Sequence, residues 1–86
     1  MNGKENRATK LQRIRQASGM TQAEAADACG VSLGVWRHYE QGSRSFDGAA
    51  LPVIIRAAIV LKCRIEELIE NPEIIRLLEE YRHEIR

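Results

Sequence analysis

The stretch TQAEAADACGVSLGVWRHYEQG, residues 21–42, carries the clearest local structural signals in the chain. Thr21 and Glu24 stand three residues apart and form a capping box, which satisfies the free backbone amides at the start of a helix. Gly30 favours the left-handed backbone that ends such a helix, and Ser32 is a good N-cap for the next one. The stretch therefore predicts two short helices that meet across a turn of three or four residues.

Helical patterns extend on both sides of this stretch. Upstream, apolar residues recur at helical spacing within residues 7–18, and Gly19 ends that segment. Downstream, helices are expected over three further segments, residues 51–62, 65–70 and 72–85. The sequence has no sustained alternation with a period of two, so the expected fold class is all-α. Two helices joined by a short turn that contains glycine are the outline of a helix-turn-helix motif.

The charge of the chain is small but unevenly distributed. The formal net charge is +1, of which residues 1–45 carry +3 and residues 46–86 carry −2. This asymmetry suggests that the N-terminal half faces a polyanion, and the alternative is a chance fluctuation of a few charges. Residues 1–6 are expected to be a flexible N-terminus. The N-terminal segment is polar, and the longest apolar run is five residues, so we expect a cytoplasmic protein with no membrane contact.

Catalytic and metal-binding patterns are absent from the sequence. Cys29 and Cys63 show no metal-ligand spacing with His38 or His83, so no metal and no cofactor is expected. Each cysteine stands where a periodic apolar residue belongs, and we interpret both as buried thiols that form no disulfide. Because the sequence has neither a nucleophile–base spacing nor a glycine-rich phosphate loop, we do not expect an enzyme.

A set of residues between about positions 11 and 69 matches the pattern of a known family. In order along the chain, it comprises Arg15, Thr21-Gln22, Ala26, Gly30-Val31-Ser32, Glu40-x-Gly42, an aliphatic helix at 51–62, Cys63 and Glu67-Leu68-Ile69. In these residues the chain resembles the phage-repressor/Cro type, or XRE type, of helix-turn-helix DNA-binding protein. The resemblance implies a lambda-repressor-like five-helix domain over residues 7–70, followed by a sixth helix within residues 71–86.

The resemblance gives some of these residues a structural role. Ala26 is the small residue needed where the two helices of the motif cross closely. Arg15 and Glu40 match a pair that forms a salt bridge in the family, joining the first helix to the end of the third. The residues expected to be structural are Arg15, Ala26, Gly30, Trp36, Tyr39 and Glu40.

Other residues match positions that contact DNA in the family, where the N-terminal part of the third helix lies in the major groove. Arg37 can donate two hydrogen bonds to guanine or bind a phosphate, and Leu33 can contact a thymine methyl group. Gln22 matches a phosphate-contacting residue at the start of the second helix. The expected DNA-binding set is Gln22, Ser32, Leu33, Gly34, Arg37, His38, Gln41, Ser43 and Arg44.

Leu33 and Gly34 depart from the family, in which many members have polar side chains at these positions. One interpretation is that Gly34 lets the backbone approach DNA closely, so that specificity comes from few base contacts and from DNA shape. The other is that this face has changed into a protein-binding surface. The sequence leaves both open.

The predicted helix over residues 51–62 is apolar nearly all round. Leu51, Ile55, Ala58 and Leu61 form the stripe expected to face the core, which leaves Val53, Ile54, Ile59 and Val60 on other faces. The last helix has a matching apolar stripe that either folds back on its own chain or pairs across a two-fold axis. For a homodimer, the expected interface residues are Ile59, Ile74, Leu77, Leu78, Tyr81 and Ile85.

Three functions are consistent with these observations. The first is a dimeric transcriptional regulator, a repressor that binds a two-fold operator on double-stranded DNA. The second is the antitoxin of a toxin–antitoxin pair, with the apolar C-terminal surfaces binding the toxin. The third is a protein-interaction module that has lost DNA binding.

Overall fold

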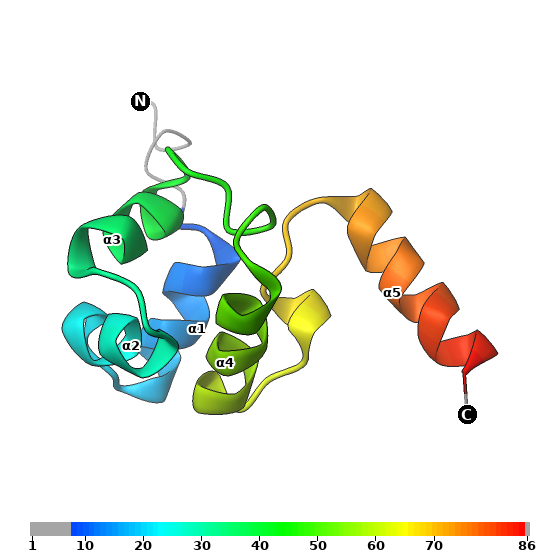
Figure 1. Cartoon of the computed structure of the whole chain (residues 1–86), viewed down its shortest axis with the longest axis horizontal. Helices are drawn as coiled ribbons and strands as arrows, with labels where there is room; N and C mark the ends of the chain where they lie inside the picture. The colour runs from blue at the N-terminus through cyan, green and yellow to red at the C-terminus, as the bar shows by residue number, and fades with distance from the viewer. Residues whose placement is uncertain (1–7, 86) are drawn as a thin grey trace.

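The computed structural model describes residues 8–85. Within these residues the fold consists of five α-helices and one 3₁₀ helix (Figure 1). In order they are α1 (Lys10–Ser18), α2 (Gln22–Cys29), α3 (Leu33–Gln41), α4 (Leu51–Leu61), η2 (Ile65–Glu67) and α5 (Pro72–Glu84). Within the described residues there is no strand, so the predicted all-α class is confirmed. The expected flexible segment 1–6 lies outside the described residues.

The helix boundaries follow from local capping chemistry. The Thr9 hydroxyl accepts a hydrogen bond from the Gln12 amide, so α1 begins at residue 10 rather than at the expected residue 7. Both bonds of the Thr21–Glu24 capping box are present at the start of α2. Gly30 ends that helix with a φ of 76°, a left-handed conformation that glycine adopts without steric cost.

The expected helix over residues 65–70 is wrong, because only the single 3₁₀ turn of η2 forms there. Leu68 and Ile69 leave the helical path and are buried in the core. The next two backbone amides, those of Glu70 and Asn71, donate instead to the Asp47 carboxylate at 3.1 and 2.9 Å. The chain therefore satisfies these amides through a distant side chain rather than through a further helical turn.

The core face of α4 also differs from the prediction. The buried residues are Ile54, Ala57, Ala58 and Leu61, whereas Leu51 is 64% exposed and Ile55 is 40% exposed. α4 packs against α2, whose buried residues there are Ala25, Ala26 and Cys29. Small side chains on both helices let the two backbones approach closely, and this rotates α4 so that its alanines face inward.

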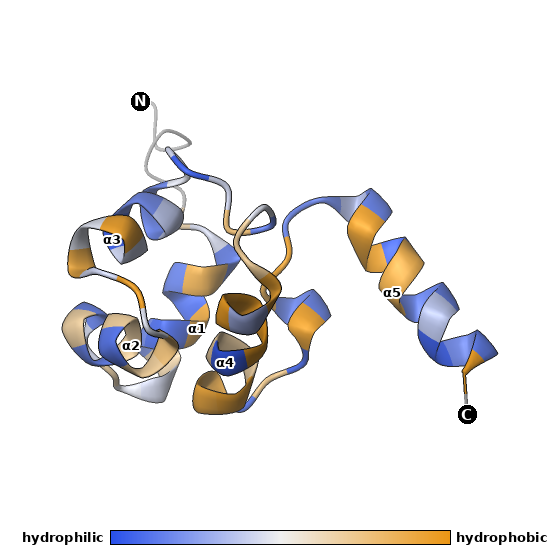
Figure 2. Ribbon diagram, in the orientation of Figure 1, coloured by the Kyte–Doolittle hydropathy of each residue, from blue (hydrophilic) through white to orange (hydrophobic). Residues whose placement is uncertain are grey.

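The last helix, α5, lies to one side of the other helices and packs against η2 (Figure 1). No residue of α5 is buried. Apolar residues lie on α4 and along α5 (Figure 2). The fold thus has one packed body, α1 to η2, and one helix attached to its side.

Candidate nucleic-acid interface

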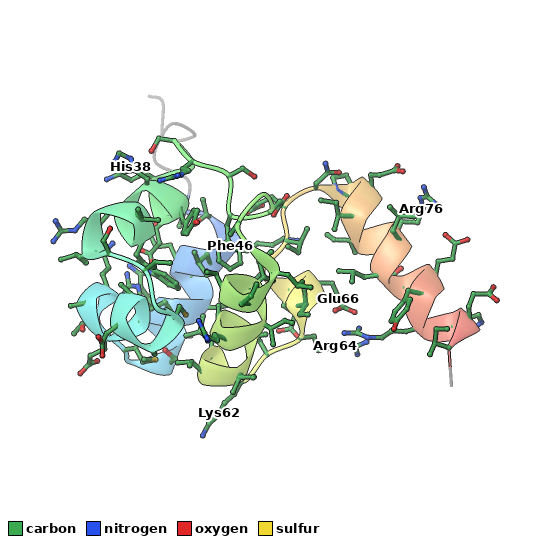
Figure 3. All side chains as sticks on the ribbon, viewed as in Figure 1. His38, Phe46, Lys62, Arg64, Glu66 and Arg76 are labelled. Carbon is green, nitrogen blue, oxygen red and sulfur yellow. The ribbon has the colours of Figure 1, made fainter. Side chains whose placement is uncertain are left out.

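The helix α3 has one buried face and one exposed face. Trp36, Tyr39 and Glu40 point into the domain and are at most 8% exposed. The exposed face carries four residues at intervals of three, one and three, which is the spacing of a single helix face. They are Gly34, Arg37, His38 and Gln41. Figure 3 shows His38 on the outer side of α3. Leu33, at the start of the helix, is half-buried.

A buried carboxylate fixes the position of α3 against α1. The Arg15 guanidinium donates from Nε to Glu40 Oε2 at 2.6 Å and from Nη2 to Glu40 Oε1 at 3.1 Å. The Trp36 indole Nε1 donates to the same Oε2 at 2.6 Å. Because a buried charge is costly unless it is paired and hydrogen-bonded, this arrangement strongly favours one position of α3.

The environment of Glu40 favours its charged form. Burial alone would raise the pKa of this carboxyl, but hydrogen bonds from Arg15, Gln22 and Trp36, together with the positive charge of Arg15, hold the pKa below its ordinary value. Glu40 is therefore an ionised hydrogen-bond acceptor at neutral pH.

Further polar side chains extend from this buried pair to the exposed face. The Nε2 of Gln22 donates to Glu40 Oε1 at 3.0 Å, and the Nε of Arg37 donates to Gln22 Oε1 at 3.4 Å. At the other end of α3, His38 Nδ1 and Ser43 Oγ lie 2.8 Å apart. The expected contact residues thus come together from α2, α3 and the loop after α3, where Ser43 and Arg44 are exposed.

Two positions at the start of α3 have distinct local roles. The Ser32 hydroxyl accepts the Val35 amide at 3.1 Å, so its oxygen already serves as the N-cap. Gly34 has open space around it, since an added Cβ would meet only the Ser32 Oγ, at 4.0 Å. Nothing within residues 8–85 therefore requires glycine at position 34.

A family model described as a helix-turn-helix domain matches residues 8–68. The chain belongs to the helix-turn-helix domain family. No curated protein and no solved structure gives a significant match. The family makes this a helix-turn-helix DNA-binding protein, with α2 and α3 as its two-helix motif.

The matched region of the helix-turn-helix protein includes the packed body and leaves α5 outside it. The large hydrophobic residues that are strongly exposed within residues 8–85 lie on α4, on α5 or, in one case, directly after α5. They are Leu51, Ile55, Ile59, Leu77, Tyr81 and, after the helix, Ile85. None lies on α1, α2 or α3. The apolar surface is therefore carried by different helices from the polar face of α3.

The remaining sequence predictions for the helix-turn-helix protein concern its cysteines, a metal site and a membrane span. Cys29 is buried and Cys63 is half-buried, and both are thiols without a disulfide. No cluster of three or more metal-ligating side chains occurs among residues 8–85. In the same part of the chain, no helix is both long enough and apolar enough to span a bilayer.

Sequence reasoning missed two residues that position this interface. The Thr9 hydroxyl donates to the Glu40 carbonyl oxygen at 3.0 Å and so joins the start of α1 to the end of α3. The Phe46 ring packs edge-on against Trp36 and Tyr39 at centroid distances of 6.4 and 5.4 Å, which anchors the loop after α3. The spacing of Thr9 and Gln12 is a capping signal that could have identified Thr9, whereas Phe46 acts through ring contacts that no local sequence signal indicates.

Proposed function

We propose that the protein is a sequence-specific transcriptional regulator, a cytoplasmic repressor of the phage-repressor/Cro type with no catalytic role. In this proposal α3 enters the major groove of double-stranded DNA. One observation carries it: the polar side chains of Arg37, His38 and Gln41 share one exposed face on the second helix of a helix-turn-helix motif, beside Gly34. A surface that reads bases needs such exposed donors on a rigid helix.

Each side chain has a distinct role in the proposed complex. Arg37 reads a guanine, and His38 donates to a purine N7 or to a guanine O6. Gln41, Ser43 and Arg44 contact the phosphate backbone beside the groove, which positions α3 but does not specify a sequence. Leu33 contacts a thymine methyl group, and Gly34 allows the start of α3 to approach the bases.

The repressor is proposed to bind its operator as a homodimer through α5. Ile75 and Arg82 lie on the side of α5 that faces η2, where Arg82 pairs with Glu66, and Leu78 is half-buried at the same helical spacing. Ile74 lies beside an adjacent stripe of α5 formed by Leu77 and Tyr81, and Ile85 follows directly after the helix. These three residues are open to solvent. Since only part of the apolar arc of α5 is covered, a second surface is needed to bury the rest.

The proposed contact between the two copies depends on the apolar stripe of α5. The charged residues near the ends of the helix are already engaged within the chain, since Glu73 pairs with Arg76 and Arg82 pairs with Glu66. A two-fold axis between the two α5 helices also presents two α3 helices to paired half-sites.

A different protein is the second candidate partner. The exposed stripe of α4, formed by Leu51, Ile55 and Ile59, is separate from the stripe of α5 and offers a second apolar surface. A toxin bound there would make the protein an autoregulating antitoxin, and the DNA-reading role of α3 would be the same. If the protein does not bind DNA, the remaining candidate function is that of a protein-interaction module.

Selection of bound sequences from random duplex DNA tests the proposal. The full-length protein is incubated with the pool at about 50 mM salt, and the affinity for the selected site is then measured between about 50 and 200 mM salt. A regulator enriches a two-fold sequence and binds it more tightly than an unrelated duplex at each salt concentration. Failure to bind any duplex at low salt rejects the regulator and supports the interaction module.

A further inference from the structure

Gln22 is the middle member of a hydrogen-bonded chain that runs from the buried Glu40 carboxylate to the exposed Arg37 guanidinium. We propose that Gln22 is a positioning residue, which aims Arg37 at its base and so helps to determine specificity at that base pair. This role differs from the phosphate contact that the family resemblance implies for Gln22. It rests on the proposed function, because it requires that α3 reads DNA.

The orientation of the Gln22 amide follows from the chemistry of Glu40. An ionised carboxylate only accepts hydrogen bonds, so the Gln22 NH₂ group must face Glu40 and its carbonyl oxygen must point away. Three bonds from Arg15 and Trp36 hold the carboxylate in place, and Glu40 is only 2% exposed. The carbonyl oxygen of Gln22 is consequently presented to Arg37, whose Nε–H donates to it.

This bond uses the part of the Arg37 guanidinium that a base contact does not need. The bond engages Nε, which leaves the donors of both terminal nitrogens for another partner. Those nitrogens form the fork that pairs with O6 and N7 of guanine. An exposed arginine otherwise samples many rotamers and loses this freedom on binding, so a bond formed before DNA arrives reduces the entropic cost.

Arg37→Ala first identifies the base pair at which Arg37 acts, as the position where its substitution removes the preference. Gln22→Ala and Gln22→Met are then measured against duplexes that carry each base pair at that position. Both variants should lower the preference there by about three- to tenfold, with little change at other positions or in the salt dependence. Gln16→Ala, which removes an exposed glutamine from α1, is the matched control and should change none of these quantities.

A spectroscopic measurement on the free protein tests the same bond without DNA. The Nε–H of Arg37 should exchange slowly with solvent in the wild type and in Gln16→Ala. In both Gln22 variants it should exchange as fast as an unconstrained arginine, while the rest of the spectrum stays that of the folded domain.

Two results would overturn the positioning role. One is a uniform loss of affinity for every duplex with a smaller salt dependence, which makes Gln22 a phosphate contact. The other is an unchanged base preference in both Gln22 variants. If the wild type binds no DNA at all, the proposed function itself is wrong, and this outcome is distinct from both.

Discussion

The guanidinium of Arg15 and the carboxylate of Glu40 form two hydrogen bonds, of 2.6 and 3.1 Å, across 25 residues of sequence. Glu40 also accepts from Trp36 and Gln22, so a single side chain holds α1, α2 and α3 together. Glu40→Gln should lower the free energy of unfolding by about 3–5 kcal/mol, because it leaves the Arg15 charge buried without its partner. Urea unfolding measures the loss. Glu79→Gln, at an exposed position, is the control, and an equal effect of both substitutions contradicts the prediction.

The same carboxylate predicts a pH dependence of stability. The pKa of Glu40 is lowered in the folded protein from its ordinary 4.5, so the unfolded chain binds this proton more tightly. Its contribution is therefore fully present above about pH 4.5 and is lost as the pH falls through the lower folded-state pKa. Unfolding free energies of the wild type and Glu40→Gln should converge as the medium is acidified. A constant difference down to pH 2 would argue against this assignment.

Substitution of Gly34 tests whether the exposed face of α3 reads DNA or binds a protein. Because an added Cβ meets no atom of residues 8–85 closer than 4.0 Å, Gly34→Ala should stabilise the fold by up to about 1 kcal/mol through the higher helix propensity of alanine. If the backbone at this position approaches DNA closely, the same substitution should weaken operator binding even though the protein is more stable. Thermal unfolding and DNA titration of one preparation give both values. A more stable protein with unchanged DNA affinity would exclude a close backbone approach.

Arg37 and Arg44 should differ in the kind of contact that they make. Arg37→Ala should cost about 1–3 kcal/mol of binding free energy on the selected site and relax the preference at one base pair. Arg44→Ala should weaken all duplexes alike and reduce the slope of log K against log salt concentration by about 1. Competition binding at several salt concentrations separates the two. If both substitutions affect selected and unrelated DNA equally, α3 does not read sequence.

The exposed stripe of α5 should control assembly. Leu77→Glu combined with Tyr81→Glu places charges in the proposed interface at two exposed positions, so the fold should be retained while the dimer dissociates. Sedimentation should change from dimer to monomer, and protection of two half-sites about 34 Å apart should be replaced by weak protection of one. Arg76→Ala, on the polar side of α5, is the control. A wild type that sediments as a monomer would show that α5 serves its own chain or another partner.

The parts of the fold that depend on neighbouring residues in the sequence could be predicted. Thr21, Glu24 and Ser32 determine helix starts through bonds to amides at most three residues away, and these boundaries match the structure closely. The exposed face of α3 also follows from helical spacing, once its buried residues are recognised. Whether that face contacts DNA stays a prediction.

The rotation of α4 about its own axis, which decides its buried face, could not be predicted from such local signals. The predicted stripe and the observed one both recur at helical intervals in a helix that is apolar nearly all round, so periodicity cannot choose between them. The choice is made by close packing against the small residues of α2, which is a tertiary effect. Likewise, no local signal connects Asp47 with amides more than 20 positions away.

The contact of Asp47 with the Glu70 and Asn71 amides links the loop after α3 to the segment that leads into α5. Its carboxylate lies three residues after Arg44 and binds the two amides that lead into α5. In the proposed two-fold complex, the direction in which α5 leaves the domain would set the separation of the two α3 helices. Substitutions around this carboxylate would thus change the distance between the half-sites that the dimer recognises, while every base-reading side chain stays the same. The spacing and the sequence of the operator could then diverge independently.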